Sequence, residues 1–215
     1  FNNRYVEERR ITVDDTLTYY NLNALFVERN RHHNVKAGID VFVNDNGTFT
    51  YTSSTNFSNG TWTSRTLGDN LNSDKVLSQR FDSRNVEPGK NISVSNDLAY
   101  THKIDTNGQE ISASVTHTWV TGSSQSMLNS LAYDSSGSEM PYMGMHRITQ
   151  SSNDIHNVIA QLDYTYVFGK GPVKGHKIDA GMKNESTLNR NVFDVYNAAN
   201  NAVQKDSLLS NGFNY

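Results

Sequence analysis

Residues 164–183 read YTYVFGKGPVKGHKIDAGMK, and they place two alternating segments on either side of a turn rich in glycine and lysine. In residues 158–168 and again in 178–182, apolar residues occupy every second position and the residues between them are mostly polar. A period of two indicates β-strands with one apolar face. A turn at 169–175 would then set apolar partners opposite one another: Tyr166 with Ile178, Tyr164 with Ala180, and Leu162 with Met182.

A second hairpin is predicted around the sequence DTNG at residues 105–108, which is a strong hairpin turn signal. The segments 92–104 and 111–119 alternate on either side of it. Pairing around this turn again puts the apolar residues on one face: Tyr100 opposite Ala113, Leu98 opposite Val115, and Val94 opposite Trp119.

A third turn signal, NDNG, follows the alternating residues 35–43, and the register predicts a turn at 44–48. The three tight turns fall about sixty residues apart. Between them lie long polar stretches, about 58–90 and 122–154, which we interpret as loops. Structureless loops longer than about 12–15 residues are uncommon inside compact soluble domains.

Composition excludes several classes of protein. The 215 residues carry a formal net charge of −3 without a strongly charged block, so no nucleic-acid partner is expected. Cysteine is absent, which excludes disulfides and thiolate metal sites. Only 35% of the residues are hydrophobic, but 11 tyrosines and 9 phenylalanines argue against disorder. No stretch approaches the roughly 18 apolar residues of a membrane helix.

The alternating runs of about 11–13 residues exceed the usual 5–6 of soluble strands and match the roughly 9–11 that span a membrane. We therefore predict an all-β fold, in which residues 1–215 form a segment of an antiparallel transmembrane β-barrel. About seven or eight long strands would have short turns at one end and long loops at the other. The predicted lipid-facing residues are Val94, Leu98, Tyr100, Val115, Trp119, Leu162, Tyr164, Tyr166, Phe168, Ile178 and Met182.

Three motifs carry a resemblance to a known family. The segment LDYTYVFGKGPVKGHKIDAGMKNESTLNR resembles the tight-turn hairpin of TonB-dependent receptor-like outer-membrane barrels of Bacteroidetes-type bacteria. KDSLLSNGFNY and AGIDVFVNDNGTFTYT are similar to two further elements of that family. The resemblance covers most of the chain from about Tyr19 onward. No plug domain or TonB box is seen, so it implies the middle or later part of a barrel of about 22 strands.

The resemblance implies a wall of an outer-membrane receptor that imports a ligand through the TonB system, with outer-membrane lipid as a further partner. The ligand could be a small molecule, a glycan or a peptide. Alternatives are a secreted all-β adhesin or carbohydrate-binding module, and a non-transporting outer-membrane anchor of a surface assembly.

Candidate site residues are few. The loop sequence SEMPYMGMHR at 138–147 gathers candidate ligand-binding residues, namely Met140, Tyr142, Met143, Met145 and His146. Flexible methionines suit adaptable binding, and thioethers with an imidazole would suit Cu(I), although packing within the loop is the simpler interpretation. We expect no metal site, no cofactor and no enzymatic activity, since no nucleophile–base motif or phosphate-binding loop occurs. His102 and His117 are not expected to meet.

Overall fold

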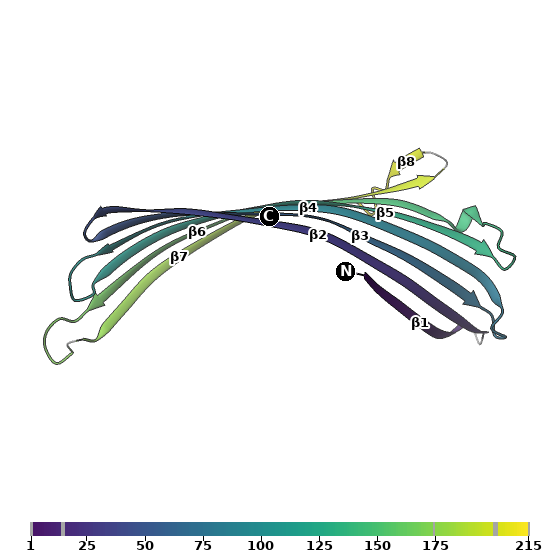
Figure 1. The fold of residues 1–215 in the computed structure, drawn as a ribbon, viewed down its shortest axis with the longest axis horizontal. Coiled ribbons are helices and arrows are strands. Elements are labelled where there is room, and N and C mark those ends of the chain that lie inside the picture. Colours follow the sequence, from purple (N-terminus) through teal and green to yellow (C-terminus); the bar gives the residue numbers. More distant parts are fainter. Residues whose placement is uncertain (1, 14–15, 174, 200–201, 215) are drawn as a thin grey trace.

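A computed structural model describes residues 2–13, 16–173, 175–199 and 202–214. Within these residues the chain forms one antiparallel sheet of nine strands in the order β1 to β8, with β9 paired to β7. The sheet is a single layer that arches along its strands (Figure 1). The elements are β1 (Asn2–Val13), β2 (Thr16–Asn44), β3 (Gly47–Leu71), β4 (Leu77–Lys103), β5 (Glu110–Asp134), the 3-10 helix η1 (Pro141–Met143), β6 (Met145–Val167), β7 (Lys177–Ala199), β8 (Ala202–Lys205) and β9 (Asn211–Asn214).

The all-β, antiparallel fold of long strands is confirmed, and so are two predicted registers. Between β4 and β5, Tyr100 pairs with Ala113, Leu98 with Val115 and Val94 with Trp119. Between β6 and β7, Tyr166 pairs with Ile178, Tyr164 with Ala180 and Leu162 with Met182. Strict alternation fixed these registers because a shift of one residue would have moved every apolar side chain to the other face.

Three short connections lie together at one end of the sheet, which we call the turn end (Figure 1). They are residues 45–46, 104–109 and 168–176, and the predicted turns at 105–108 and 169–175 lie within the last two, with residue 174 outside the described part. The predicted turn at 44–48 is too long. A register shift between Phe42 and Asn44 lets Asn44 pair with Gly47, so that Val41 faces Phe49.

The predicted long loops at 58–90 and 122–154 are wrong. Most of these residues continue strands β3 to β6, and only residues 72–76 and 135–144 connect them at the far end. Strands β2 to β7 are therefore 23–29 residues long, about twice the predicted length. Toward the end of the described chain, β7 runs to Ala199 and β8 pairs back onto it.

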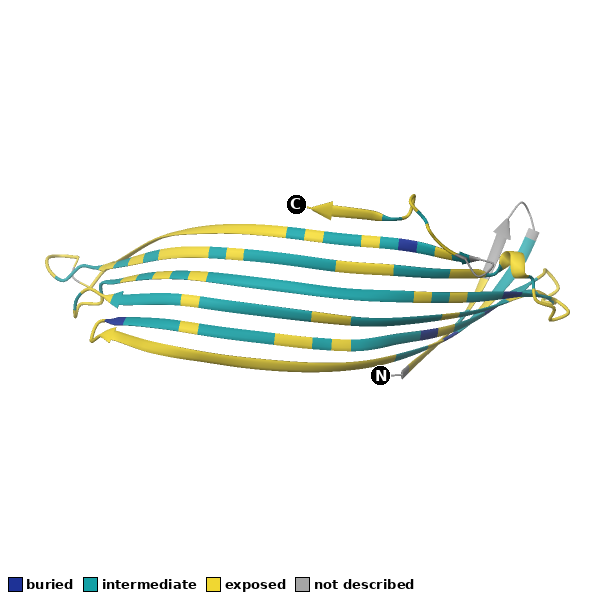
Figure 2. Ribbon diagram, turned by 90° about the horizontal axis from the view of Figure 1, so that it is seen from above, coloured by how far each residue is buried: buried dark blue, intermediate teal, exposed yellow. Residues whose placement is uncertain are grey.

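A conventional core is absent from the residues whose burial is described. Apart from glycines, the buried residues are Ala24, Ser64, Ala132 and Val195, all near the far end, and the rest of the sheet is half-buried or exposed on both faces (Figure 2). Among the described residues, no helix is long and apolar enough to cross a membrane.

The sheet is open in the part of the chain described here. β1 covers β2 only as far as Val27, and β8 and β9 cover β7 only from Arg190 onward. Residues 28–44 of β2 and 177–189 of β7 therefore have unpaired backbone edges. Both edges lie in the turn-end half of the sheet.

The hairpin turn at 104–109 depends on one glycine and one carboxylate. Asp105 accepts hydrogen bonds from the backbone N–H groups of Asn107 and Gln109, at 2.9 and 3.0 Å. Gly108 has φ of +100°, in the left-handed region that side chains disfavour.

We predict that Gly108→Ala will lower the free energy of unfolding by about 1–2 kcal/mol, because alanine is strained at this φ. The matched control is Gly89→Ala in β4, where an added Cβ would meet only ordinary contacts at 3.6 Å or more. Urea unfolding in detergent should separate the two variants, and equal losses would contradict the turn assignment.

Candidate functional site

The two faces of the sheet differ most in the turn-end half. All of the predicted lipid-facing strand residues share one face by register, which we call the outer face; the opposite face is the inner face. Near the turn end the outer side chains of β5 and β6 are mostly more exposed than the inner ones, as on the outer side of a curved sheet. Phe168 lies beyond the end of β6, where its ring packs edge-on against Tyr166 with centroids 4.9 Å apart.

The outer face carries an apolar band next to the turns. In β6 every outer residue from Tyr166 to Val158 is apolar, and the next three outward are His156, Asp154 and Ser152. About ten residues at about 3.4 Å each, tilted by about 45°, reach about 24 Å, close to the roughly 25 Å band of outer-membrane barrels. The remaining half of each long strand lies beyond this band.

A polar cluster marks the upper border of the band on the outer face. Trp119 donates a hydrogen bond from Nε1 to Asp154 Oδ1 at 2.7 Å. The Trp119 ring stacks on the His156 ring, with centroids 6.1 Å apart. The His156 ring also stacks on that of His117, with centroids 5.5 Å apart. The nearest ring nitrogens of the two histidines are 3.2 Å apart.

This cluster was missed in the sequence. His102 and His117 do not meet, as predicted. The overlooked signal was the β5–β6 register, which sets Trp119 directly opposite His156 and brings His117 next to it. Among the described residues, no group of three or more His, Asp or Glu side chains has the arrangement to hold a metal ion, this cluster included.

Beyond the band, the outer face carries ion pairs. Arg65 donates two hydrogen bonds to Asp82, at 3.1 and 2.7 Å, and Arg80 donates two to Asp69. Bidentate Arg–carboxylate pairs are typical of a hydrated surface or interface and not of lipid contact. Hydrogen bonds from Arg65, aided by its charge, hold the pKa of Asp82 below its ordinary value.

The inner face is mostly polar within the height of the band, with apolar exceptions such as Phe42, Ala99 and Ile159. Short hydrogen bonds join neighbouring strands: Thr50 to Asp40 at 2.6 Å, Thr116 to Asp97 at 2.7 Å and Thr165 to Asp179 at 2.7 Å. Lys177 also pairs with Asp179 at 2.9 Å. A face of this kind suits a hydrated lumen.

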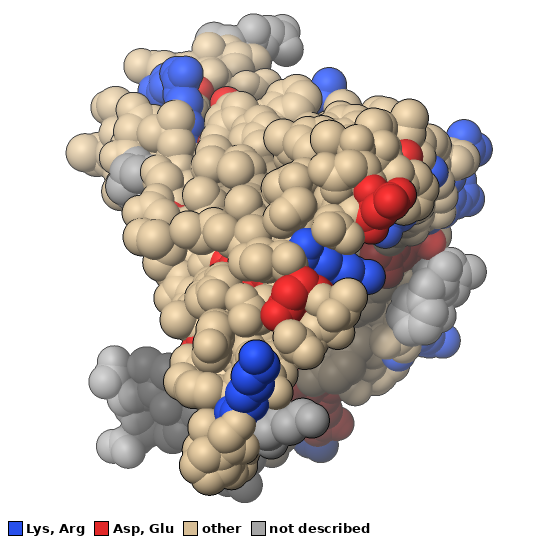
Figure 3. All heavy atoms as spheres, turned by 90° about the vertical axis from the view of Figure 1, so that its left-hand side faces the viewer, with Lys and Arg blue, Asp and Glu red and all other residues tan. Residues whose placement is uncertain are grey.

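Figure 3 views the sheet end-on from the turns and so does not show the inner face by itself. At this end, acidic and basic side chains are interspersed without a large patch of one sign.

A trough of about 390 Å³, which we call the inner trough, lies on the inner face above the band. Its floor is low because Gly60 pairs directly with Gly89, and Gly122 follows on the next strand. The side chains that border it include Asn30, His32, Trp62, Glu87, Asn91 and Asn153. An indole beside several amides offers both stacking and hydrogen bonding to a ligand.

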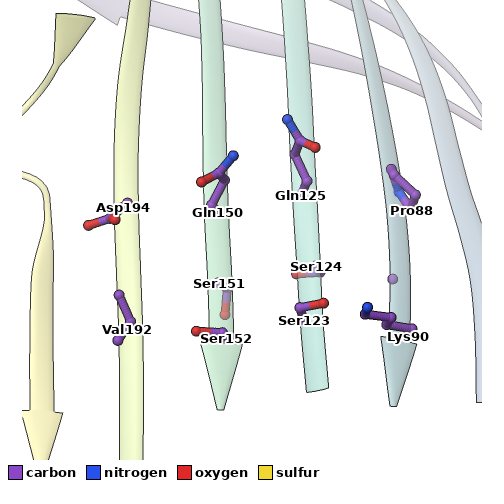
Figure 4. A pocket seen from close by; sticks show the side chains of 11 residues that line it. Pro88, Lys90, Ser123, Ser124, Gln125, Gln150, Ser151, Ser152, Val192 and Asp194 are labelled. Atoms are coloured by element: carbon purple, nitrogen blue, oxygen red, sulfur yellow. The ribbon is translucent and has the colours of Figure 1, made fainter. Parts of the chain in front are cut away.

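A second hollow, of about 470 Å³, lies on the outer face at a similar height. Figure 4 shows Asp194, Gln150, Gln125 and Pro88 in one row across four strands, with Val192, Ser152, Ser123 and Lys90 in the next. We call it the outer hollow. Pairing between β4 and β5 is interrupted at Glu87 and Pro88, as expected because proline has no N–H to donate.

The structure separates the predicted ligand-binding residues of the loop. Met140 and Tyr142 touch, with the Tyr142 hydroxyl 3.5 Å from Met140 Sδ, and Gln79 donates to Met143 Sδ at 2.9 Å. Met145 and His146 are neighbours on β6 and so point to opposite faces. Ligand binding by these residues stays a prediction, but the five do not converge on one cavity.

The long two-faced strands define the wall of an outer-membrane barrel, and comparison with known proteins agrees. Residues 102–215 match the model of the outer membrane protein beta-barrel family, and the chain belongs to this family. The protein therefore resides in the bacterial outer membrane, in contact with its lipid. No curated protein matches the chain. A pneumolysin structure is 6% identical to this chain over 98% of this chain and 88% of that one, with a TM-score of 0.12.

Labelling on β5 tests the assignment of the faces, since the chain contains no native cysteine. We predict that a fluorophore on Val115→Cys is quenched by nitroxide lipids, whereas one on Ser114→Cys is quenched by aqueous iodide. Ser123 lies on the same face as Val115 but beyond the band, so a fluorophore on Ser123→Cys should be quenched by iodide. Equal lipid quenching at 114 and 115 would contradict the two faces.

The Arg65–Asp82 pair predicts a dependence on pH. Because the pKa of Asp82 is lowered in the folded state, its stabilisation is present above the ordinary carboxyl pKa and is lost as pH falls through the folded pKa. At pH 7, Asp82→Asn should lower the free energy of unfolding by no more than about 1 kcal/mol, because the Arg65 side chain is largely exposed.

Melting temperatures of the wild type and Asp82→Asn should converge once pH drops well below about 4. Arg84→Gln is the control, since Arg84 has no ion pair among the described residues. A difference that persists unchanged at low pH would refute the role given to this pair.

Proposed function

We propose that the chain forms the wall of a TonB-dependent outer-membrane receptor that imports a ligand, and that it has no enzymatic activity. The observation that carries this proposal is the contrast between faces: an apolar outer band about ten residues tall, backed by a polar, hydrogen-bonded inner face. A wall that only anchors a protein in lipid needs the first feature but not the second.

The strands beyond the band support a receptor role. They extend the inner face outward as an ordered sheet, and this extension holds the inner trough. A ligand captured there would already lie inside the mouth of the barrel. We therefore place the ligand site in the inner trough, with Trp62 as the stacking surface and the surrounding amides as hydrogen-bonding groups.

A secreted adhesin or carbohydrate-binding module is disfavoured, because the family is one of outer-membrane barrels. The apolar outer band also remains uncovered in this single-layer sheet, with Leu98, Val115 and Leu162 each more than 40% exposed. A sandwich would need a second sheet against that face. A non-transporting anchor shares the outer band and is separated from a receptor by experiment.

The TonB step is tested with the complete protein. We expect the purified periplasmic domain of TonB to bind it in detergent, and this binding to strengthen when a transported ligand is present. An anchor would not bind TonB. Failure to bind under conditions where a known TonB-dependent receptor does so would overturn the import proposal.

The trough is tested separately by whole-cell retention of three labelled probes: a ferric hydroxamate, a neutral oligosaccharide and a short peptide. For the probe that is retained, Trp62→Ala should reduce affinity by about fivefold or more, the effect of losing one aromatic stacking contact. The control is Tyr51→Ala on the outer face of the same strand. Equal probe retention by Trp62→Ala and Tyr51→Ala would contradict the placement of the ligand site in the inner trough.

A further inference from the structure

We propose that the outer hollow binds the phosphorylated sugar headgroup of an outer-leaflet glycolipid, with the acyl chains descending along the apolar band. The inference depends on the membrane placement of the wall and not on ligand import.

The first argument is height. The rows of the hollow that contain Ser123 and Gln125 lie four and six residues beyond Trp119 on the same face of β5. At about 3.4 Å per residue and a tilt of about 45°, they stand about 10–14 Å above the indole. Interfacial tryptophans sit at the level of the headgroups. A compact headgroup would end below the hollow, whereas one built from sugars reaches into it.

The second argument is shape. Serines at 123 and 152 form a low floor between Lys90 on one side and Val192 on the other (Figure 4). The resulting volume of about 470 Å³ is large enough for a disaccharide-sized group. Directly below the hollow on the same face lie Asp154 and Trp119, and the apolar band begins beyond them. A lipid whose polar head fills the hollow would therefore pass its acyl chains beside the indole to reach the band.

The third argument is charge. Asp194, the acid that lines the hollow, is already paired with Lys205 at 2.7 Å. Asp154 below it accepts from Trp119. In the described part of the chain, no ion pair engages Lys90, which lines the hollow. Arg190 lies on the same face two residues from Val192, below the lining of the hollow and opposite Asp154 in the β6–β7 register. Lys90 is therefore the cation available to a phosphate, and the serine and glutamine side chains are available to sugar hydroxyls.

The test uses the complete protein in detergent and native mass spectrometry with three probes. These are a diphosphorylated, acylated glucosamine disaccharide, the same lipid without phosphates, and phosphatidylethanolamine. We expect the first to bind most tightly and to resist competition by millimolar inorganic phosphate. Lys90→Gln should weaken its binding by about tenfold, the loss of one charge-assisted contact. Lys36→Gln, an exposed lysine on the inner face, should leave it unchanged.

Ser152→Trp fills the hollow without removing a charge, and it should abolish the preference for the glycolipid. Circular dichroism, and the difference in gel-electrophoretic migration between heated and unheated samples, will show whether each variant folds. Equal binding of the three lipids, or full binding by Lys90→Gln and Ser152→Trp, would show a nonspecific annulus and overturn the proposal. Loss of TonB binding in these variants is not expected, so the two proposals fail independently. A protein partner that competes with the glycolipid for the hollow would also overturn the lipid assignment.

Discussion

Backbone N–H and C=O groups that lie in hydrocarbon must find hydrogen-bond partners within the protein, because no water is present there to bond to them. The ladder from β2 to β7 satisfies this constraint across the whole height of the apolar band. The two unpaired edges, 28–44 and 177–189, lie within that height, where an open edge is least tolerated. These two edges must therefore be paired with further strands before the sheet can lie in the membrane.

The same constraint explains why part of the fold could be predicted from the sequence. Inside the band one face meets lipid and the other meets water, so the side chains alternate and the registers of Leu98 with Val115 and Leu162 with Met182 follow. Beyond the band both faces meet water. Ser123, Ser124 and Gln125 then carry no alternation although they are strand residues, and a polar strand of this kind cannot be told from a loop by its pattern.

The candidate site was less predictable because it depends on neighbours across strands. The inner trough arises where Gly60, Gly89 and Gly122 come together, although they are far apart in the sequence. The Trp119–His156–His117 stack likewise follows only from the β5–β6 register. The methionines of the β5–β6 connection looked like a site because they are close in sequence, but a strand start places Met145 and His146 on opposite faces.

Hydrogen-bonded strands that continue well past the bilayer change what a molecule outside the cell would encounter. Instead of mobile loops it meets a rigid, hydrogen-bonded sheet, and in the described part of the chain the connections 72–76, 135–144 and 206–210 lie outside the strands at this end. Antibodies, phages and inserted peptide tags would find conformationally tolerant sequence at such connections, on a sheet that holds them well above the membrane.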